Sequence, residues 1–382
     1  MKRILVTGVR APAALDVMRG LSKKGFEVYA ADCLNFALGR FSSVVKAYVH
    51  LPAPRYAFDA FRRELVAFVQ KHHIDVIFPT CEEVFYLSAC KEELEEHCDV
   101  FCEGLDVLSQ LHNKFVFQKL AKENGLGAIN TFLVENEQMP LPVLDHEKTY
   151  VVKPVFSRFG DNAILNLKPE HIKQHLSTRL FPWAIQEHIQ GTEYCSYALC
   201  RNGEVLAESC YEPYFRAKQG ASVYFKVVSK PEIFAQVRTF ARQLNYTGQL
   251  GFDFIERADG KLFVLECNPR CTSGVHLISD IEWPAAFSDS SHREAPVASM
   301  RSGMLSLGML MFGLSPPNTH GIKEFLASYR DANDVIYSKQ DRKPSILQFV
   351  SVLEVFWRSL KKRQSLKEAS TVDIEWDGQH IG

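Results

Sequence analysis

The sequence lacks the features that mark membrane-spanning and polyanion-binding proteins. Its longest apolar run, about residues 303–314, is shorter than the roughly 18 residues that a membrane span needs. Lysine and arginine total 44 against 45 aspartates and glutamates, a net charge of −1, so no basic surplus favours nucleic acid or anionic lipid. We therefore expect neither nucleic acid nor a membrane as a partner.

Cysteine motifs and an export signal are also missing. The ten cysteines are scattered and none forms a Cys-x-x-Cys pair, a spacing that suits neither a zinc site nor a redox motif. The apolar stretch Ile4-Leu5-Val6 is too short for a signal peptide, and Arg10 interrupts the chain soon after it. We expect a cytoplasmic protein with reduced thiols.

The 382 residues suffice for two or three domains, and the first of these alternates strand and helix. Short apolar segments bounded by turn residues predict strands, and amphipathic segments between them predict helices. This pattern is typical of a doubly wound parallel α/β domain. The expected strands are Lys2–Gly8, Glu27–Ala31, Asp75–Pro79 and Cys98–Phe101, and the expected helices are Pro12–Gly25, Tyr56–His72 and Glu82–His97.

The first turn of this domain only partly matches a dinucleotide-binding fingerprint. Gly8 is the first glycine of a G-x-G-x-x-G pattern, and Asp32 lies where a ribose-binding acid would sit. Arg10 and Ala13 replace the other two glycines. We therefore favour a plain strand–helix turn, whose helix N-terminus can hold an anion.

From residue 113 the pattern becomes antiparallel. Asn202-Gly203 and Asp259-Gly260 are hairpin turn signals, and a helix is expected between them at Lys230–Leu244. Near the C-terminus an amphipathic helix, Ile346–Leu360, has a wide apolar face, which we expect to dock on the body of the protein or on a second subunit.

Three oxygen-bearing side chains of the middle region indicate a cation site. Glu266 and Asn268 share one face of a strand because alternate residues point the same way, and Cys267 points to the other face. Asp253 lies on the preceding strand of the same hairpin. Two carboxylates and an amide oxygen suit Mg²⁺, and Arg270 could hold a transferring phosphoryl group. The alternative is a solvated acidic pair on a hairpin.

Two further segments favour a nucleotide. Lys153 ends a strand before the loop Ser157–Gly160, so its ammonium and the loop amides could surround phosphate oxygens. The strand edge Gln186–Ile189 and Glu193 could clamp adenine and ribose. Each signal alone is also that of a solvated strand end.

Together these residues resemble the ATP-grasp superfamily over about residues 1–280, closest to its carbamoyl-phosphate-synthase and biotin-carboxylase-like branch. The most specific part is Glu266-Cys267-Asn268-Pro269-Arg270 after Gly251–Ile255. The resemblance implies a mixed α/β and α+β fold: a parallel pre-ATP-grasp domain, a two-lobed ATP-grasp domain with antiparallel sheets, and a helical C-terminal extension. The expected bounds are 1–112, 113–310 (lobes 113–190 and 191–310) and 311–382.

The resemblance also implies a role for each matching residue. Lys114 and Lys153 would contact phosphate groups, and Ser157, Arg158 and Gly160 would belong to a mobile phosphate loop that is poorer in glycine than usual. The adenine hinge would be Glu187, His188 and Ile189, and the ribose acid would be Glu193. The cation ligands would be Asp253, Glu266 and Asn268, and the phosphate-side arginine would be Arg270. We expect Lys153 and Arg270 to act in catalysis, and ATP with Mg²⁺, or alternatively Mn²⁺, as cofactors.

The implied activity is that of a ligase which phosphorylates a carboxylate with ATP and couples the acyl phosphate to an amine. Arg216, Lys218 and Ser273 are candidate substrate contacts, whereas His188 and His276 are expected to be ordinary histidines. The partners would be a small carboxylate and a small amine, with a homodimer as the assembly. The alternatives are a carboxylate-phosphorylating or carboxylating enzyme and a nucleotide-binding regulatory protein without turnover.

Overall fold

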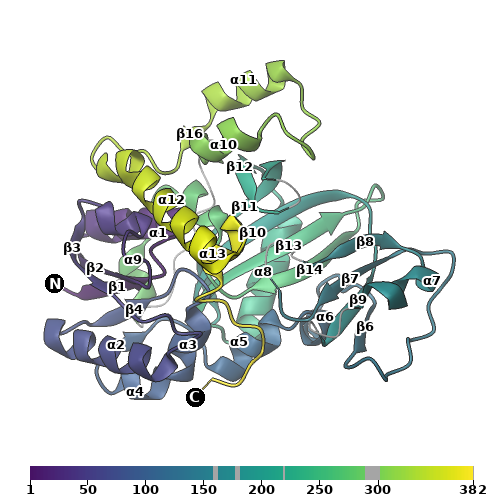
Figure 1. Ribbon diagram of the computed structural model, residues 1–382, viewed down its shortest axis with the longest axis horizontal. Coiled ribbons are helices and arrows are strands. Elements are labelled where there is room, and N and C mark those ends of the chain that lie inside the picture. The colour runs from purple at the N-terminus through teal and green to yellow at the C-terminus, as the bar shows by residue number, and fades with distance from the viewer. Residues whose placement is uncertain (158–161, 177–180, 218–219, 289–301, 382) are drawn as a thin grey trace.

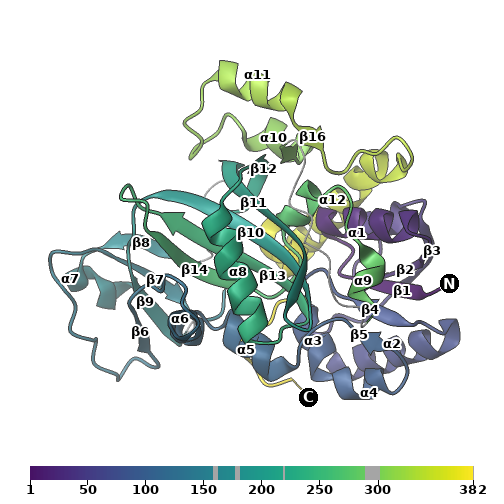
Figure 2. The same ribbon diagram turned by 180° about the vertical axis from the view of Figure 1, so that it is seen from behind.

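The computed structural model describes residues 1–157, 162–176, 181–217, 220–288 and 302–381. Three sheets organise these residues, one parallel and two mainly antiparallel, as Figures 1 and 2 show from opposite sides. The predicted mixed α/β class is confirmed. Three predicted site residues, Arg158, Gly160 and Lys218, lie outside the described residues.

The N-terminal domain is a parallel sheet of order β3-β2-β1-β4-β5. The central strand β1 has wholly buried side chains at Ile4, Leu5 and Val6. Consecutive apolar residues of this kind are typical of a parallel strand that is covered on both faces of its sheet. The strands are β1 Arg3–Thr7, β2 Glu27–Asp32, β3 Val45–His50, β4 Val76–Phe78 and β5 Asp99–Val100. The helices are α1 Pro12–Lys23, α2 Phe58–His72, α3 Val84–Ala89, α4 Lys91–Glu95 and α5 Leu105–His112.

The sequence prediction of this domain missed one strand and joined two helices into one. The edge strand β3 is missing from the sequence prediction, since its half-exposed residues give no continuous apolar run. The single helix expected at Glu82–His97 is two short helices that meet at Cys90, whose φ of −112° is not helical. The four predicted strands and the other two predicted helices of this domain are confirmed.

The first lobe of the next domain is a four-stranded sheet of order β6-β9-β7-β8. Asn113 starts its helix α6 by accepting hydrogen bonds from the backbone amides of Phe115 and Val116, which have no partner inside the helix. The elements are α6 Lys114–Glu123, β6 Thr131–Val134, β7 Tyr150–Pro154, β8 Ile164–Leu167, α7 Pro169–Ile172 and β9 Trp183–Glu187.

The second lobe is a seven-stranded sheet of order β14-β13-β10-β11-β12-β15-β16. The predicted turn at Asn202 and Gly203 joins β10 to β11, and both residues have a positive φ, 49° and 77°, as a tight hairpin requires. The elements are β10 Thr192–Arg201, β11 Glu204–Arg216, β12 Ser222–Val227, α8 Pro231–Gln243, β13 Gly248–Glu256, β14 Leu262–Asn268, α9 Trp283–Ala286, β15 Gly303–Met304 and β16 Asn333–Asp334.

The C-terminal segment contains α10 Ser306–Phe312, α11 Ile322–Asp331, α12 Lys343–Lys362 and α13 Leu366–Thr371. Helices α12 and α13 (yellow in Figure 1) cross between the N-terminal domain and the second lobe. The expected boundary at 310 separates β15 from β16, although these two strands pair. Among the described residues, no helix is long and apolar enough to cross a membrane.

The apolar face of α12 does not dock on the body of the protein, so this part of the expectation was wrong. Five of its apolar side chains remain 43–61% exposed: Phe349, Val352, Leu353, Phe356 and Trp357. The helix turns its other face inward, where Glu354 accepts hydrogen bonds from the backbone amides of Asn35 and Phe36. Docking of the apolar face on a second subunit stays a prediction.

Candidate active site

A cavity of about 780 Å³ lies where the two lobes, the N-terminal domain and the C-terminal extension meet. Every predicted site residue that the structure describes lines this cavity, including Lys114 on α6, Glu187 on β9 and Asp253 on β13. The sequence therefore located the cavity correctly, while the role of each residue stays a prediction.

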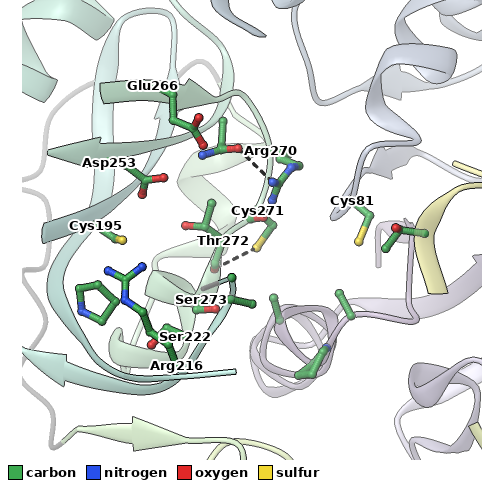
Figure 3. A pocket seen from close by; sticks show the side chains of 18 of the residues that line it. Cys81, Cys195, Arg216, Ser222, Asp253, Glu266, Arg270, Cys271, Thr272 and Ser273 are labelled. Atoms are coloured by element: carbon green, nitrogen blue, oxygen red, sulfur yellow. Dashed lines mark hydrogen bonds between the residues drawn. The ribbon is translucent and has the colours of Figure 1, made fainter. Parts of the chain in front are cut away.

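Asp253 and Glu266 are direct cross-strand partners in the β13–β14 hairpin, so their carboxylates lie on the same face of the sheet. In Figure 3 both side chains point into the cavity from adjacent strands. Strand alternation also holds for the neighbours of Glu266: Asn268 lines the cavity, and Cys267 is 2% exposed within the hydrophobic core. The hairpin thus gathers the three predicted oxygen donors on one side.

The two carboxyl groups differ in their electrostatic environment. Burial and the negative charge of Glu266 raise the pKa of Asp253 to about 7. Burial also opposes ionisation of Glu266, but the positive charges of Lys114, Lys153 and Arg270 hold its pKa below the ordinary value. A bound cation would favour the charged form of Asp253, so this buried pair suits a hard divalent ion.

Acidic and histidine side chains alone would not supply enough ligands for a cation at this place. Among the described residues, no group of three His, Cys, Asp or Glu side chains is placed to hold a metal. The amide oxygen of Asn268 completes the predicted set, and it already accepts a hydrogen bond of 3.0 Å from the Arg270 guanidinium. Further oxygen ligands would have to come from phosphate groups or water.

Two buried lysines supply positive charge to the same cavity. The ammonium group of Lys114 donates to the backbone carbonyl of Ser157 at 2.7 Å and lies 3.8 Å from a carboxylate oxygen of Glu266. Burial lowers the pKa of Lys153 to about 8, although the carboxylate of Glu266 opposes this shift. Since Lys153 is only 8% exposed, an anion in the cavity would stabilise its charged form strongly.

Sequence reasoning missed Glu82, which binds the predicted phosphate-side arginine from the N-terminal domain. Its carboxylate is wholly buried and lies 3.5 Å from the Nε atom of Arg270. Together with the hydrogen bond to Asn268, this ion pair fixes the direction of the guanidinium group. The position of Glu82 just after β4 was a usable signal, because ligand-site residues in parallel sheets follow the carboxyl ends of strands.

Part of the backbone of the predicted adenine hinge is already hydrogen-bonded to neighbouring segments of the protein. The backbone amides of Glu187 and His188 donate to the carbonyls of Asn130 and Thr149, and the Glu187 carboxylate pairs with Lys148 at 2.9 Å. An adenine contact at His188 would therefore have to use its carbonyl group.

The predicted ribose acid, Glu193, also has a partner in the protein, because it forms an ion pair of 2.5 Å with Arg216 across the cavity wall. The two residues were predicted for different ligands, the ribose and the substrate. In this structure each neutralises the other, and a ligand that binds one of them must replace or share that contact. Ser273, the other described substrate candidate, begins the short 3₁₀ helix Ser273–Leu277 that comes after Arg270.

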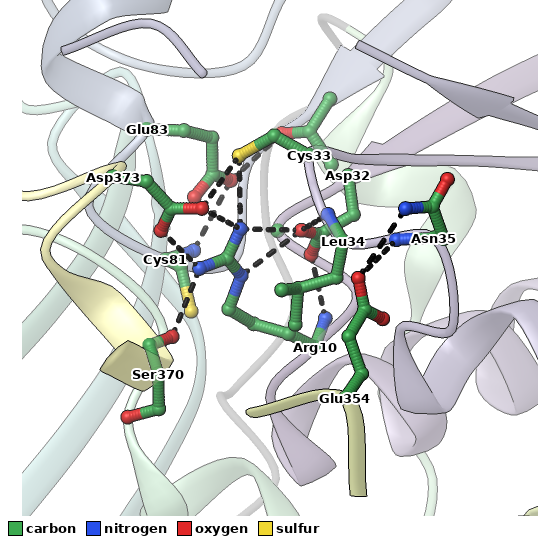
Figure 4. Close-up of polar contacts among 12 residues, drawn as sticks. Arg10, Asp32, Cys33, Leu34, Asn35, Cys81, Glu83, Glu354, Ser370 and Asp373 are labelled. Atoms are coloured by element: carbon green, nitrogen blue, oxygen red, sulfur yellow. Dashed lines mark hydrogen bonds and ion pairs between the residues drawn. The ribbon is translucent and has the colours of Figure 1, made fainter. Parts of the chain in front are cut away.

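The Gly8 turn is filled by the protein itself, which supports the plain strand–helix interpretation. Arg10 donates to both oxygens of Asp32 through its backbone and side chain, and to Asp373 from the C-terminal segment (Figure 4). A Cβ atom at Gly8 would lie only 2.5 Å from the carboxylate oxygens of Glu83. The acid that could have bound a ribose thus belongs to an internal ion-pair cluster.

Among the cysteines and histidines that were not predicted to belong to the site, the structure adds Cys81, Cys195, Cys271 and His276 to the cavity lining. Cys195 is the cross-strand partner of Asp253, and burial raises the pKa of its thiol well above the usual range, which disfavours the nucleophilic thiolate. His276 contacts Asp16 of α1 at 2.5 Å through Nδ1 and stacks on Phe225. Its side chain is 2% exposed and also lines the cavity, so the expectation that it is an ordinary histidine stays a prediction.

The two lobes and their carboxylate hairpin match a known protein family. A family model described as an ATP-grasp domain matches residues 129–274. This region is an ATP-grasp domain. The match starts just before β6 and ends within the 3₁₀ helix Ser273–Leu277, so it includes the strands from β6 to β14, and with them the β13–β14 hairpin, but not α6, α9, β15 or β16.

Solved structures share the wider fold of this protein. The N5-carboxyaminoimidazole synthetase of Staphylococcus aureus in complex with ADP has a TM-score of 0.64 and 14% identity, covering 90% of this chain and 91% of that one. The L-amino acid ligase of Bacillus licheniformis has a TM-score of 0.58 and 14% identity, covering 73% and 70%. A biotin carboxylase of Campylobacter jejuni has a TM-score of 0.58 and 11% identity, covering 77% and 72%.

A curated relative extends the similarity at the level of sequence. An uncharacterised protein of Methanocaldococcus jannaschii is 23% identical over 279 residues, covering 70% of this chain and 68% of its own. The family model supports the predicted superfamily for residues 129–274, and the solved structures support the predicted fold. These matches identify no substrate for this protein.

Proposed function

We propose that this ATP-grasp protein is an ATP-dependent ligase that phosphorylates a substrate carboxylate and couples it to an amine. The observation that carries the proposal is the pairing of Asp253 with Glu266 in a buried cavity beside Lys114, Lys153 and Arg270. This arrangement combines a hard-cation site with three cations that suit phosphate oxygens. A regulatory protein that only binds nucleotide would have no need of it.

The donor set fits Mg²⁺, since all three predicted ligands offer oxygen atoms. Asp253, Glu266 and Asn268 would hold the ion, whose chemistry is to neutralise charge on the triphosphate. Lys114 and Lys153 would bind phosphate oxygens, and Glu193 would bind the ribose once Arg216 releases it. Phosphoryl transfer then depends on positioning and electrostatics rather than on a protein nucleophile.

Two steps complete the proposed reaction. A carboxylate oxygen of the first substrate attacks the γ-phosphorus, and ADP leaves with the bridging oxygen. The amine then attacks the carbonyl carbon of the acyl phosphate, inorganic phosphate leaves, and the amine proton passes to phosphate or water. Arg270, held by Glu82, would stabilise the phosphoryl group during transfer.

The proposal is tested by ADP release over a panel of carboxylates and amines, with hydroxylamine added to trap an acyl phosphate. We expect slow ADP release with the correct carboxylate alone, and a hydroxamate when hydroxylamine is present. The correct amine should raise the rate and replace the hydroxamate with an amide. Full-rate ADP release without any carboxylate, or substrate label that stays on the protein, would contradict the ligase mechanism.

A further inference from the structure

The C-terminal tail, residues 372–381, follows α13 without forming a helix or a strand. Figures 1 and 2 both show the C-terminus close to α5 of the N-terminal domain. The carbonyl of Glu375 accepts hydrogen bonds from the Tyr86 hydroxyl at 2.7 Å and from the Arg55 guanidinium at 2.9 Å. Trp376 is 6% exposed, although the four residues after it are exposed. Specific contacts therefore dock the tail on the protein.

The indole ring of Trp376 contacts both the N-terminal domain and the first lobe. It stacks on Phe85 of α3, with ring centroids 4.9 Å apart. It also meets Phe156 edge to face at 5.2 Å, and Phe156 belongs to the segment that leads out of β7. The indole nitrogen donates to the carbonyl of Gln379 at 2.7 Å, so the polar atom of the ring has a partner in its buried position. Trp376 thus links two units of the fold.

Gly378 brings the backbone of the tail against the same phenylalanine. Its φ is 87°, a conformation that residues with side chains rarely adopt. A Cβ atom at this position would lie 2.5 Å from the Cε2 atom of Phe156. From the N-terminal domain, His112 at the end of α5 also contacts the ring of Phe156, with centroids 5.8 Å apart. The tail and α5 together fix the position of this ring.

Phe156 lies between two residues whose carbonyl groups bind Lys114. The carbonyl of Ser157 accepts a hydrogen bond of 2.7 Å from the Lys114 ammonium group, and the carbonyl of Val155 accepts one of 3.2 Å from the Lys114 backbone amide. Ser157 and Lys114 line the active-site cavity, whereas Phe156 and Trp376 do not. The aromatic contacts are therefore one step removed from the predicted phosphate site.

We propose that the C-terminal tail positions the phosphate contacts of the ATP site, with Trp376 acting through Phe156 on Ser157 and Lys114. This inference rests on the proposed function, which assigns Lys114 to phosphate oxygens. The Lys114 side chain is buried, so the few acceptors that face its ammonium group determine its direction. A shift of the Ser157 carbonyl would turn the ammonium group away from phosphate, and a misplacement of about 1 Å can lower a rate by about 10²-fold. Trp376 is thus a positioning residue.

The affinity for nucleotide tests the proposal without requiring turnover. The measurement is calorimetric titration of the full chain with a non-hydrolysable ATP analogue and Mg²⁺. We expect Trp376→Ala to raise the Kd by about tenfold or more. Trp376→Phe keeps an aromatic ring beside both neighbours and should recover most of the affinity. A Kd of Trp376→Ala within about twofold of the parent value, far short of that loss, would overturn the proposal.

Ile374→Ala separates positioning from a general loss of stability. Ile374 lies in the same tail and is 2% exposed, but it belongs to the cluster of Cys33 and Cys81, which differs from that of Trp376 and Phe156. Either alanine leaves a cavity in a buried site, so both variants should melt at a lower temperature than the parent. We expect Ile374→Ala to retain the parent affinity well below its melting temperature. An equal loss of affinity in both variants would overturn the positioning role.

A double-mutant cycle tests the route through Phe156. When Phe156 is already replaced by alanine, Trp376→Ala should change the Kd for the ATP analogue little, because the side chain on which Trp376 acts is missing. Losses that are fully additive would show that Trp376 does not act through Phe156.

A pair of glycine variants tests the same contact without truncating any side chain. Gly378 and Gly25 both have a φ of 87°, so Gly378→Ala and Gly25→Ala introduce similar backbone strain. A Cβ atom at Gly25 would meet nothing within 4 Å, whereas one at Gly378 would press on Phe156. We expect Gly378→Ala to weaken binding of the ATP analogue several-fold and Gly25→Ala to leave it unchanged. Equal affinities would contradict the proposal.

The outcomes distinguish this proposal from the ligase function. Nucleotide affinity that depends on Trp376, without ADP release for any carboxylate and amine, would keep the positioning role and overturn the ligase. Ligation by the parent, with affinity that is insensitive to Trp376→Ala, would do the opposite. In the active enzyme we expect Trp376→Ala to raise the KM for ATP and to leave the KM values for carboxylate and amine near those of the parent. Equal increases in all three KM values would contradict an action through the phosphate contacts.

Discussion

Arg10 and Asp373 are 363 positions apart in the sequence, yet the guanidinium Nη1 of Arg10 lies 2.5 Å from the Asp373 carboxylate. Asp32 on the other side of Arg10 completes a buried cluster (Figure 4). The contact closes the first turn of the N-terminal domain and fixes the C-terminal segment against it. We expect both the nucleotide preference and the acid stability of the protein to depend on it.

The first prediction concerns the choice of nucleotide. We expect ATP with Mg²⁺ to raise the melting temperature, because a ligand at 100 times its dissociation constant stabilises the folded state by about 2.7 kcal/mol. NAD and NADP should change it little, since Arg10 occupies Asp32 and Glu83 fills the space beside Gly8. Thermal unfolding with each nucleotide is the measurement. A larger shift with NAD than with ATP would place the nucleotide at the Gly8 turn.

The second prediction concerns acid stability. Burial opposes ionisation of Asp373, but Arg10 and Arg358 hold its pKa below the usual range. Its stabilising contribution is therefore complete above the ordinary aspartate pKa, about 4, and is lost as pH falls through the lower pKa of the folded state. Asp373→Asn should lose about 3 kcal/mol of unfolding free energy at pH 7. The difference from the parent should shrink below about pH 4.

Urea unfolding between about pH 3 and pH 7 measures this difference. Asp377→Asn is the control, because that carboxylate is 48% exposed and its ion pair with Arg55 lies near the surface, where such pairs contribute little. A difference between Asp373→Asn and the parent that does not vary with pH would show that the charge of Asp373 is not what stabilises the fold.

The third prediction concerns the paired carboxylates. Glu266→Gln keeps the shape of the side chain and removes one negative charge, so ADP formation should fall by about 10²-fold or more, as when one preorganised transition-state contact is lost. Glu256→Gln on β13 is a matched control, because Glu256 pairs with Lys230 and does not line the cavity. Steady-state ADP assays with melting temperatures are the measurement. Turnover of Glu266→Gln within about twofold of the parent would show that Glu266 is not a ligand.

The fourth prediction concerns assembly. The exposed apolar side chains of α12 form a stripe that a second subunit could cover, and contiguous stripes of this kind mark interaction surfaces. We expect a particle of twice 43.4 kDa in sedimentation equilibrium, and dissociation by Phe356→Lys. Leu326→Lys on α11, with a parent side chain of 59% exposure, should not dissociate it. A monomer at tens of micromolar would contradict the homodimer.

The success of the sequence analysis at the hairpin has a physical cause. Alternation along one strand and a short turn determine that Glu266 and Asn268 face one way and Cys267 the other, so local rules suffice. The predicted strand Tyr150–Lys153 came similarly from an apolar run and the proline that follows it. These features depend on residues close together in the chain.

Contacts between distant segments were not predictable in the same way. Nothing local to Glu82 indicates that it binds Arg270, and nothing near Asp373 indicates that it reaches Arg10. The same holds for α12, whose apolar face was expected to dock on the body but stays largely exposed. Such placements depend on how whole elements pack, which a single sequence does not report.

The most direct test of the central claim is to follow oxygen from the substrate carboxylate. With a carboxylate labelled by ¹⁸O, ATP and the amine, an acyl phosphate transfers one labelled oxygen to the inorganic phosphate in each turnover. Mass spectrometry of the phosphate measures this directly. We predict one ¹⁸O atom per phosphate released, with none from labelled water. Phosphate that takes its new oxygen from water instead would show simple ATP hydrolysis and contradict the ligase account.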